Sequence, residues 1–261
     1  MTTSSSSPGL SGARLVAFDL DDTLAPSKSP LPAAIRPLIA RLTQVVPVAV
    51  VSGGAFGQFV SQVIAPLAHE PGARIDRLHL MPACGTQYLR WSGEGWETIY
   101  AEHLDLEVRQ RAAVALEEEA RRLDLWSEST WGPIIEDRLS QVTFSALGQQ
   151  APIDEKAAWD PDGEKRARLR VAVADRLPDF EVRAGGSTSL DITRAGIDKG
   201  YGIRRLSEHT GVALDEMLFF GDQLFPGGND HAVAALGVPV IAVASWHDTA
   251  AGLEALLESV A

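Results

Sequence analysis

The stretch Leu15-Val-Ala-Phe18-Asp19-Leu20-Asp21-Asp22-Thr23 decides how the rest of the chain is interpreted. Its four apolar residues predict a short buried strand that runs directly into acidic residues. An extended backbone at that point would place Asp19 and Asp21 on the same side. Two carboxylates in one small space repel each other, and a Mg²⁺ ion, which prefers oxygen ligands, would relieve the repulsion. An acidic turn or helix cap is the ordinary alternative.

Three more apolar runs, at residues 47–51, 217–220 and 238–243, alternate with helical patterns along the chain. Strands that alternate with helices predict a doubly wound α/β core with a parallel sheet. The first two of these runs, like residues 15–18, end in polar or glycine-rich residues. Because ligands bind beyond the carboxyl ends of parallel strands, we expect those polar residues to share one crevice.

Two of the candidate site motifs are suited to phosphate. Ser52 and Gly53 follow the second apolar run, where small residues let hydroxyl and backbone N–H groups approach a phosphate at a helix start. Lys199, in Gly196-Ile-Asp-Lys-Gly200, would supply a point charge for a transferring phosphoryl group. The ordinary alternatives are a glycine turn between strand and helix, and a solvated surface lysine.

The fourth motif, at residues 221–230, directly follows the apolar run at 217–220. Asp222 stands at its beginning, and a Pro-Gly-Gly turn would return Asn229 and Asp230 to the same place. These side chains offer oxygen ligands, so they are candidates for a metal site together with Asp19 and Asp21. An ordinary loop rich in Asp and Gly is the alternative.

The middle of the chain has a different pattern of predicted strands and helices. Hairpin-like runs at residues 86–100, a strand pattern at 141–146 and amphipathic helix patterns at 104–125 and 163–177 predict an α+β module. We therefore expect a domain at residues 85–184, inserted into a core formed by residues 13–84 and 185–261. Most of the six tryptophans fall in this middle region, where we expect them to pack its interior. The Ser-rich residues 1–12 predict a flexible tail.

The composition narrows the class of protein. The 23 Lys and Arg residues against 35 Asp and Glu give a net charge of −12, which disfavours nucleic-acid and anionic membrane partners. The single cysteine, Cys84, rules out an intramolecular disulfide framework. With no long apolar run and no leader pattern, we expect a cytoplasmic protein without a membrane partner. The oligomeric state is left open.

The four motifs in this order resemble the haloacid dehalogenase (HAD) superfamily, and the Gly-Ile-Asp-Lys-Gly element is similar to its IIB branch, which carries a type-2 cap domain. The resemblance implies a Rossmann-like core with an inserted α+β type-2B cap. It also implies that Asp19 is the nucleophile and Asp21 the general acid and base. Mg²⁺ would be held by Asp19, the backbone carbonyl of Asp21 and Asp222.

Within that branch the chain is most similar to eukaryotic-type phosphomannomutases. Ile135-Glu-Asp-Arg138 resembles that family's strand with a substrate arginine, and Gly185-Gly-Ser-Thr-Ser189-Leu-Asp191 resembles its substrate-binding segment. The resemblance implies that Arg138, Ser189 and Asp191 face a sugar phosphate, with Lys28 in the place of an arginine. For Arg138, an ion pair with Glu136 is the alternative. The chain departs from the family at Gln149, where a cap arginine stands, and at Asp22, where a glycine is usual.

These observations predict a Mg²⁺-dependent phosphotransferase that works through an aspartyl-phosphate on a small substrate, a hexose phosphate by resemblance. A mutase must retain a bisphosphate and present each end in turn, so the loss of a cap cation at Gln149 favours a sugar-phosphate phosphatase. A phosphomannomutase is the alternative. A non-catalytic sugar-phosphate-binding module is a further alternative, although no expected catalytic side chain is missing.

Overall fold

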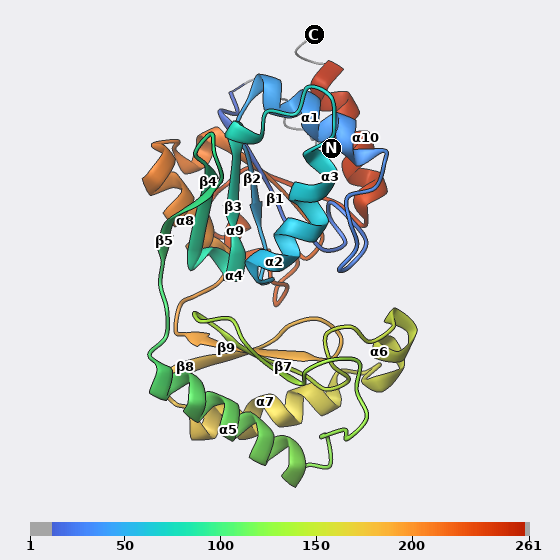
Figure 1. Ribbon diagram of the computed structural model, residues 1–261, viewed down its shortest axis with the longest axis vertical. Helices are drawn as coiled ribbons and strands as arrows, with labels where there is room; N and C mark the ends of the chain where they lie inside the picture. The colour runs from blue at the N-terminus through green and yellow to red at the C-terminus, as the bar shows by residue number, and fades with distance from the viewer. Residues whose placement is uncertain (1–11, 259–261) are drawn as a thin grey trace, which may run out of the picture. The chain divides into compact units, whose positions relative to one another are not determined.

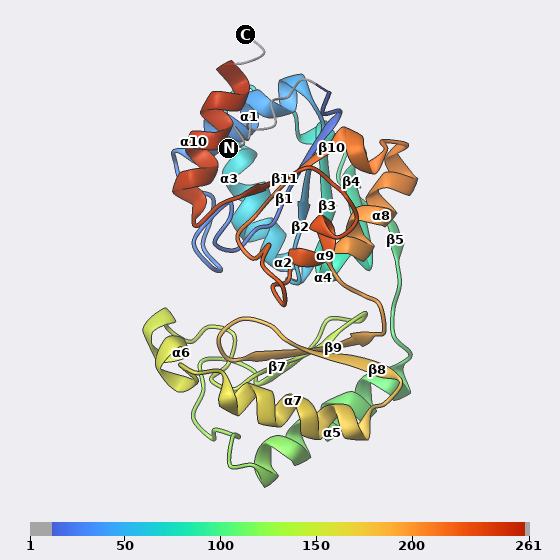
Figure 2. The ribbon, with the colours of Figure 1, turned by 180° about the vertical axis from the view of Figure 1, so that it is seen from behind.

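The computed structural model describes residues 12–258, which form two compact units (Figures 1 and 2). The first unit contains the residues up to Ala101 and those from Asp198 onward, and the second contains Glu102–Ile197. Apart from Gly12, the predicted N-terminal tail lies outside the described residues.

The first unit is built on a seven-stranded sheet with the order β11-β10-β1-β2-β3-β4-β5. Its five strands from β11 to β3 are parallel, and β4 and β5 extend the sheet as an antiparallel hairpin. The strands are β1 (Leu15–Phe18), β2 (Val48–Val51), β3 (Leu78–Met81), β4 (Gln87–Trp91), β5 (Trp96–Ala101), β10 (Met217–Gly221) and β11 (Val240–Ala242). All four predicted apolar runs are therefore strands of one sheet, and β3 is a strand that the sequence analysis did not identify.

Helices cover both faces of this sheet, as Figures 1 and 2 show. They are α1 (Ile35–Val45), α2 (Phe56–Phe59), α3 (Ala65–Leu67), α4 (Pro82–Gly85), α8 (Lys199–Thr210), α9 (His231–Ala234) and α10 (Trp246–Glu258), with a π-helical segment at Val60–Ile64 and 3₁₀ turns at Ile75–Arg77 and Leu214–Glu216. Side chains alternate along β1: Val16 and Phe18 join one apolar cluster, and Leu15 and Ala17 join the other. The predicted doubly wound α/β core is confirmed.

The second unit is a four-stranded antiparallel sheet with helices packed on one face. Its strands have the order β6-β7-β9-β8. The elements are β6 (Ile135–Asp137), β7 (Val142–Ser145), β8 (Phe180–Ala184), β9 (Ser189–Arg194), α5 (Leu106–Arg122), α6 (Ile153–Trp159) and α7 (Glu164–Arg176). Phe144 and Leu190 face an apolar cluster that includes Leu116 of α5 and Leu169 of α7. The period of two in a strand leaves the opposite face of this sheet polar.

The expected boundaries of the inserted domain, residues 85 and 184, were wrong at both ends. The hairpin β4–β5 belongs to the first unit because β4 pairs with β3, with Leu89 opposite Leu80. The hairpin β8–β9 belongs to the second unit because β9 pairs with β7. A hairpin pattern reports only the pairing of two neighbouring strands, and the sheet that a hairpin joins is decided by contacts distant in sequence.

Because the second unit begins later in the chain than expected, two of the tryptophans lie in the first unit. Trp91 and Trp96 lie in the first unit, where their rings meet edge to face at 5.9 Å. Trp126 and Trp159 pack against the apolar cluster of the second unit, as expected. Trp131 does not, because it is 43% exposed.

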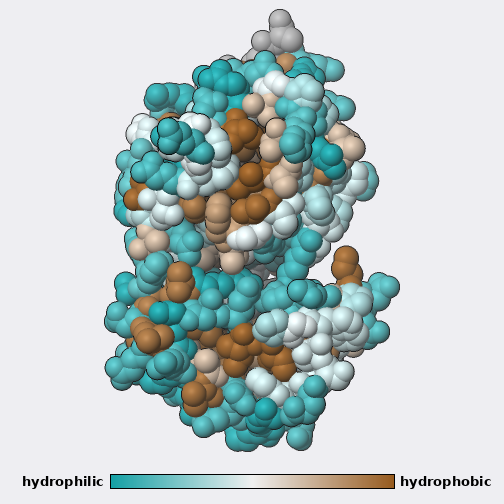
Figure 3. Space-filling view, in the orientation of Figure 1, coloured by the Kyte–Doolittle hydropathy of each residue, from teal (hydrophilic) through white to brown (hydrophobic). Residues whose placement is uncertain are grey.

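The surface seen in Figure 3 carries apolar residues in patches among hydrophilic ones on both units. Among the described residues, no helix is both long and apolar enough to cross a lipid bilayer.

One buried titratable group in the first unit makes the stability of the fold depend on pH. His79 of β3 is 4% exposed, and its Nδ1 lies 2.6 Å from the hydroxyl of Tyr88. Burial, and to a lesser degree the charge of Arg90, lower the pKa of His79 to about 4. The unfolded chain, with an imidazole pKa near 6.5, therefore binds this proton before the folded chain does.

We expect the free energy of unfolding to fall by about 3 kcal/mol from this group as the pH drops from about 6.5 to about 4. The substitution His79→Gln, which keeps a polar partner for Tyr88, should flatten that part of the pH dependence. Urea unfolding at a series of pH values measures it. His69→Gln, at an exposed loop position, is the matched control and should keep the full slope. An unchanged slope in His79→Gln would assign the effect to another group.

Candidate active site

Asp19 lies where β1 ends, at the carboxyl edge of the parallel sheet. Its backbone N–H donates to the carbonyl of Phe220 at 3.0 Å, which continues the pairing of β1 with β10 past the strand end. The side chain is buried, at 4% exposure, and its Oδ1 lies 2.6 Å from Nζ of Lys199. The nucleophile predicted from the sequence is thus a buried carboxylate with a cationic partner.

Lys199 is delivered to this place by the start of α8. The side chain of Asp198 caps the helix by accepting the N–H of Tyr201 at 2.7 Å, so that Lys199 is the first helical residue. Nζ of Lys199 also contacts Oδ1 of Asp230 at 2.6 Å and Oδ1 of Asn229 at 3.0 Å. The surface-lysine alternative is therefore wrong, because the side chain is 2% exposed and has three oxygen partners.

The loop after β10 brings Asp222 and Asp230 together, as its turn residues predict. Oδ2 of Asp230 accepts the backbone N–H of Gln223 at 3.0 Å, which ties the two ends of the loop. Gly221 leaves room for that carboxylate, since a Cβ there would lie 2.6 Å from Oδ2 of Asp230. Asp222 accepts a longer hydrogen bond, 3.4 Å, from the hydroxyl of Thr23.

Asp19, Asp222 and Asp230 form an acidic cluster in which one ligand atom from each lies within 4.8 Å of the others. Three carboxylates and the ammonium of Lys199 leave a formal charge of −2 (−3 + 1), which a divalent cation would balance. An all-oxygen donor set suits Mg²⁺. The residues present therefore fit this ion, although the oxygen of Asn229 and one oxygen of Asp230 already serve Lys199.

The pKa shifts of Asp19 and Lys199 also fit a cation bound at the cluster. Burial raises the pKa of Asp19 well above its usual range; Lys199 opposes that rise, and Asp230 and Asp222 add to it. Burial alone would lower the pKa of Lys199, but Asp19 and Asp230 raise it above its ordinary value, so the ammonium stays charged. A cation bound to the cluster would favour the ionised, nucleophilic form of Asp19.

Ser52 and Gly53 lie at the end of β2, the strand next to β1. Their loop is held by the left-handed turn of α4: Cys84 N–H donates to the carbonyl of Ser52 at 2.9 Å, and Ala83 N–H to the carbonyl of Gly54 at 3.0 Å. The hydroxyl of Ser52 accepts the N–H of Gly54 at 3.2 Å. The predicted phosphate loop and Asp19 therefore occupy neighbouring strand ends of one sheet edge.

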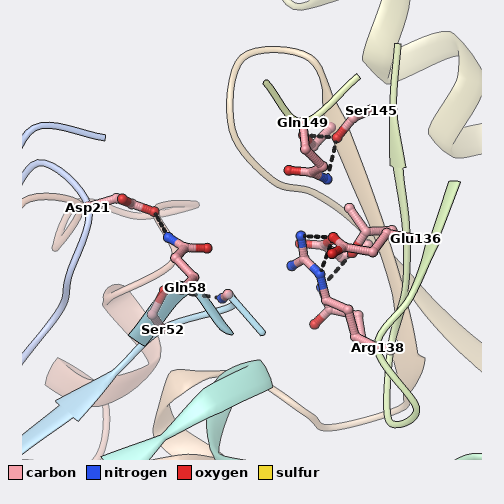
Figure 4. Close-up of polar contacts among 12 residues, drawn as sticks. Asp21, Ser52, Gln58, Glu136, Arg138, Ser145 and Gln149 are labelled. Carbon is pink, nitrogen blue, oxygen red and sulfur yellow. Dashed lines mark hydrogen bonds and ion pairs between the residues drawn. The ribbon is translucent and has the colours of Figure 1, made fainter. Parts of the chain in front are cut away.

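The carboxylate of Asp21 has its own set of partners. It accepts Nε2 of Gln58 at 2.9 Å (Figure 4). It also accepts the backbone N–H of Lys28 at 2.6 Å and Nε2 of Gln62 at 3.2 Å. It is not part of the acidic cluster of the described residues. The sequence analysis missed both glutamines, although their spacing of four residues after the Ser-Gly-Gly turn would place them on one helical face.

The loop after Asp21 explains one departure from the family. Asp22 has a φ of 63°, in the left-handed region that glycine adopts without strain and Asp adopts at a modest cost. Ser27 N–H donates to the Asp22 carboxylate at 3.2 Å, a local contact that glycine does not offer. Lys28 also has a positive φ, 56°, and its side chain is exposed.

The second unit carries the remaining predicted residues on its polar sheet face. Oδ1 of Asp191 accepts the hydroxyl hydrogen of Thr143 at 2.7 Å, and the hydroxyls of Ser189 and Ser145 lie 3.1 Å apart. Gln149 donates to the Ser145 hydroxyl at 2.7 Å (Figure 4). Neutral hydroxyl and amide groups therefore surround Gln149, which stands where the resembled family has a cap arginine.

Arg138 makes the ion pair that the sequence analysis kept as its alternative. Its guanidinium lies 2.6 Å from the carboxylate of Glu136, and its side chain is 9% exposed (Figure 4).

A protein-family model and several known proteins match this chain. The family model described as eukaryotic phosphomannomutase matches residues 118–259, more than half of the 261 residues. The phosphomannomutase of Saccharomyces cerevisiae is 25% identical over 231 residues, covering 84% of each chain.

Among solved structures, an IMP-bound mutant of Plasmodium falciparum IMP-nucleotidase superposes with a TM-score of 0.72 and 14% identity, covering 95% of this chain and 68% of the other. A haloacid dehalogenase-like hydrolase from Bacteroides thetaiotaomicron has a TM-score of 0.61 and 18% identity, covering 95% of this chain and all of the other. These two likenesses concern the fold. The match over residues 118–259 shows that the chain belongs to the eukaryotic phosphomannomutase family, a family of phosphotransferase enzymes.

Proposed function

We propose that the chain is a Mg²⁺-dependent enzyme that transfers a phosphoryl group from a small sugar phosphate to Asp19 and then to water. The observation that carries the proposal is the buried carboxylate of Asp19, 2.6 Å from Lys199 and within the acidic cluster at the carboxyl edge of the sheet. The charge of Lys199, together with a divalent cation bound at the cluster, would lower the repulsion between an anionic nucleophile and an anionic phosphate.

In the first half of the reaction, an oxygen of Asp19 attacks phosphorus in line while the bond from phosphorus to the sugar oxygen breaks. Asp21 gives its proton to that leaving oxygen. Lys199 and Ser52 stabilise the equatorial oxygens of the transferring group. Asp19, Asp222 and the backbone carbonyl of Asp21 would hold Mg²⁺, which would supply positive charge to the phosphate.

In the second half, Asp21 takes a proton from a water molecule, whose oxygen attacks the phosphorus of the aspartyl-phosphate. The bond between phosphorus and the Asp19 oxygen breaks, and inorganic phosphate leaves. In a mutase, a second hydroxyl of the sugar would replace this water. The two activities therefore differ only in the acceptor of the same phosphoryl group.

The polar sheet face of the second unit favours water as the acceptor. We propose that this unit is a cap that contributes Arg138, Ser189 and Asp191 to sugar binding, with Lys28 from the first unit. Gln149 and Ser145 offer hydrogen bonds but no positive charge, and Arg138 is already paired with Glu136. A bisphosphate whose far end needs a cation would be retained poorly by such groups.

A phosphomannomutase is the second candidate, and the family match over residues 118–259 favours it. A hexose phosphate is the proposed substrate class under both candidates. A non-catalytic binding module is the remaining alternative, and the retained pairing of Asp19 with Lys199 argues against it.

Asp19→Asn should lower kcat by roughly 10³-fold or more, because the amide cannot form the phosphoenzyme. The assay follows free phosphate and hexose 6-phosphate from mannose 1-phosphate and glucose 1-phosphate, with and without Mg²⁺. Asp76→Asn makes the same change at an exposed position in the first unit and should keep full activity. Turnover that survives in Asp19→Asn would reject the aspartyl-phosphate route.

Gln149→Arg should raise the ratio of mutase to phosphatase turnover, because it adds a further cation beside the Ser145 hydroxyl. The measurement compares hexose 6-phosphate with free phosphate from hexose 1-phosphate in the presence of the matching 1,6-bisphosphate. Gln150→Arg places the same charge on the adjacent, exposed residue and is the matched control. If the wild type already makes hexose 6-phosphate without phosphate release, the mutase candidate holds and Gln149 does not select water.

A further inference from the structure

The helical stretch after the Ser52 loop presents two amides to the carboxylate of Asp21. Gln58 lies in α2 and Gln62 in the π-helical segment, four residues apart. Nε2 of Gln58 donates to Oδ2 of Asp21 at 2.9 Å, and Nε2 of Gln62 donates to Oδ1 at 3.2 Å. Each carboxylate oxygen is thereby held by an amide, so the plane of the carboxylate is fixed from two sides.

Gln62 is oriented by more than this one contact. Its side chain is 1% exposed, and the same Nε2 donates to the carbonyl of Ser29 at 2.8 Å. Both partners of Nε2 are acceptors, which settles which end of the amide faces Asp21. Among the described residues, Oε1 of Gln62 has no hydrogen-bond partner. A buried acceptor without a partner costs free energy, so the two contacts of Nε2 hold the amide in this orientation against that cost.

The sequence explains why the backbone carbonyl of Gln62, in the π-helical turn, has no donor within its own helix. In an α-helix the carbonyl of Gln62 would accept the N–H of residue 66, but that residue is Pro66 and has none. The helix widens instead, with Ala65 N–H donating to the carbonyl of Val60, and the Gln62 carbonyl accepts the N–H of Leu31 at 2.9 Å. Turns of this kind are frequent at functional sites.

The consequence is that Gln62 fastens the loop after Asp21 at three points. Its backbone carbonyl accepts the N–H of Leu31, and its side-chain Nε2 donates to the carbonyl of Ser29 and to the carboxylate of Asp21. The N–H of Lys28, in the same loop, donates to Asp21 as well. The loop and the carboxylate are therefore held as one unit.

We propose that Gln58 and Gln62 are positioning residues that orient the carboxylate of Asp21 for proton transfer. The proposal rests on the proposed function, in which Asp21 is the general acid and base. Proton transfer demands that the acid lie within hydrogen-bond reach of the leaving oxygen, so a rotated carboxylate would lose much of its effect. The glutamines themselves touch neither the phosphate nor the sugar in this scheme.

The contact is tested without any turnover. In the full-length protein, Asp21→Asn should shift the side-chain amide resonances of Gln58 and Gln62 in a ¹⁵N-correlated NMR spectrum. The resonances of Gln44, which donates to the carbonyl of Gly72, should stay in place. Unshifted resonances of Gln58 and Gln62 would overturn the proposal.

The positioning role is tested by the choice of leaving group. A hexose phosphate releases a basic alkoxide that needs a proton, whereas p-nitrophenyl phosphate releases a weakly basic phenolate that does not. In single-turnover measurements, Gln58→Leu should slow alcohol release from the hexose phosphate by roughly 10-fold to 100-fold. Release of p-nitrophenol should slow by less than about threefold, because that step does not need the acid. Gln44→Leu, the matched control, should alter neither rate.

Gln62→Leu, if it folds, should likewise slow release from the hexose phosphate more than release of p-nitrophenol. If Gln62→Leu does not fold, the rates of Gln58→Leu alone test the proposal. Equal slowing of both esters by Gln58→Leu would overturn the proposal and leave the glutamines as supports of the loop alone. A wild-type chain that releases neither alcohol would reject the proposed function instead, while the amide resonances would still report whether the glutamines hold Asp21.

Discussion

The buried contact of Lys199 with Asp19 and Asp230 is the interaction on which the rest of the site depends. Removing charges from water is costly, so a buried lysine must keep close anionic partners. Its two carboxylates come from the ends of β1 and of the loop after β10, and the lysine comes from the start of α8. The contact therefore requires that three segments, far apart in sequence, meet within hydrogen-bond distance.

To bring these three segments so close together, the surrounding backbone has glycine at several positions where a Cβ would clash. Gly221 admits the carboxylate of Asp230, and a Cβ at Gly200 would lie 2.8 Å from the carbonyl of Ala232 in α9. A Cβ at Gly202, two residues further along α8, would lie 2.8 Å from the carbonyl of Cys84. Side chains at these positions would push α8 away and withdraw Lys199 from its partners. The same helix thus carries the cation and supports the turn that holds the Ser52 loop.

The two candidate activities share this chemistry and differ in what surrounds it. In the proposed mechanism, attack by Asp19 uses groups at the edge of the parallel sheet, and these groups belong to the first unit. The choice between water and a sugar hydroxyl as acceptor depends on how firmly a second phosphate is retained. The neutral contacts of Gln149 and Ser145 in the second unit bear on that choice and leave the first step untouched.

The sequence by itself determined the α/β core, the order of the motifs and the place of three of the four motifs at strand ends, because those features follow from local patterns of apolar and turn residues. Only the tertiary structure decided that β4 and β5 join the core sheet, that Arg138 pairs with Glu136, and that Gln58 and Gln62 hold Asp21. These outcomes depend on strand pairing and helix register. For the glutamines, the spacing of four residues indicated a shared helical face, but only the packing of that helix against the loop after β1 decided that this face meets Asp21.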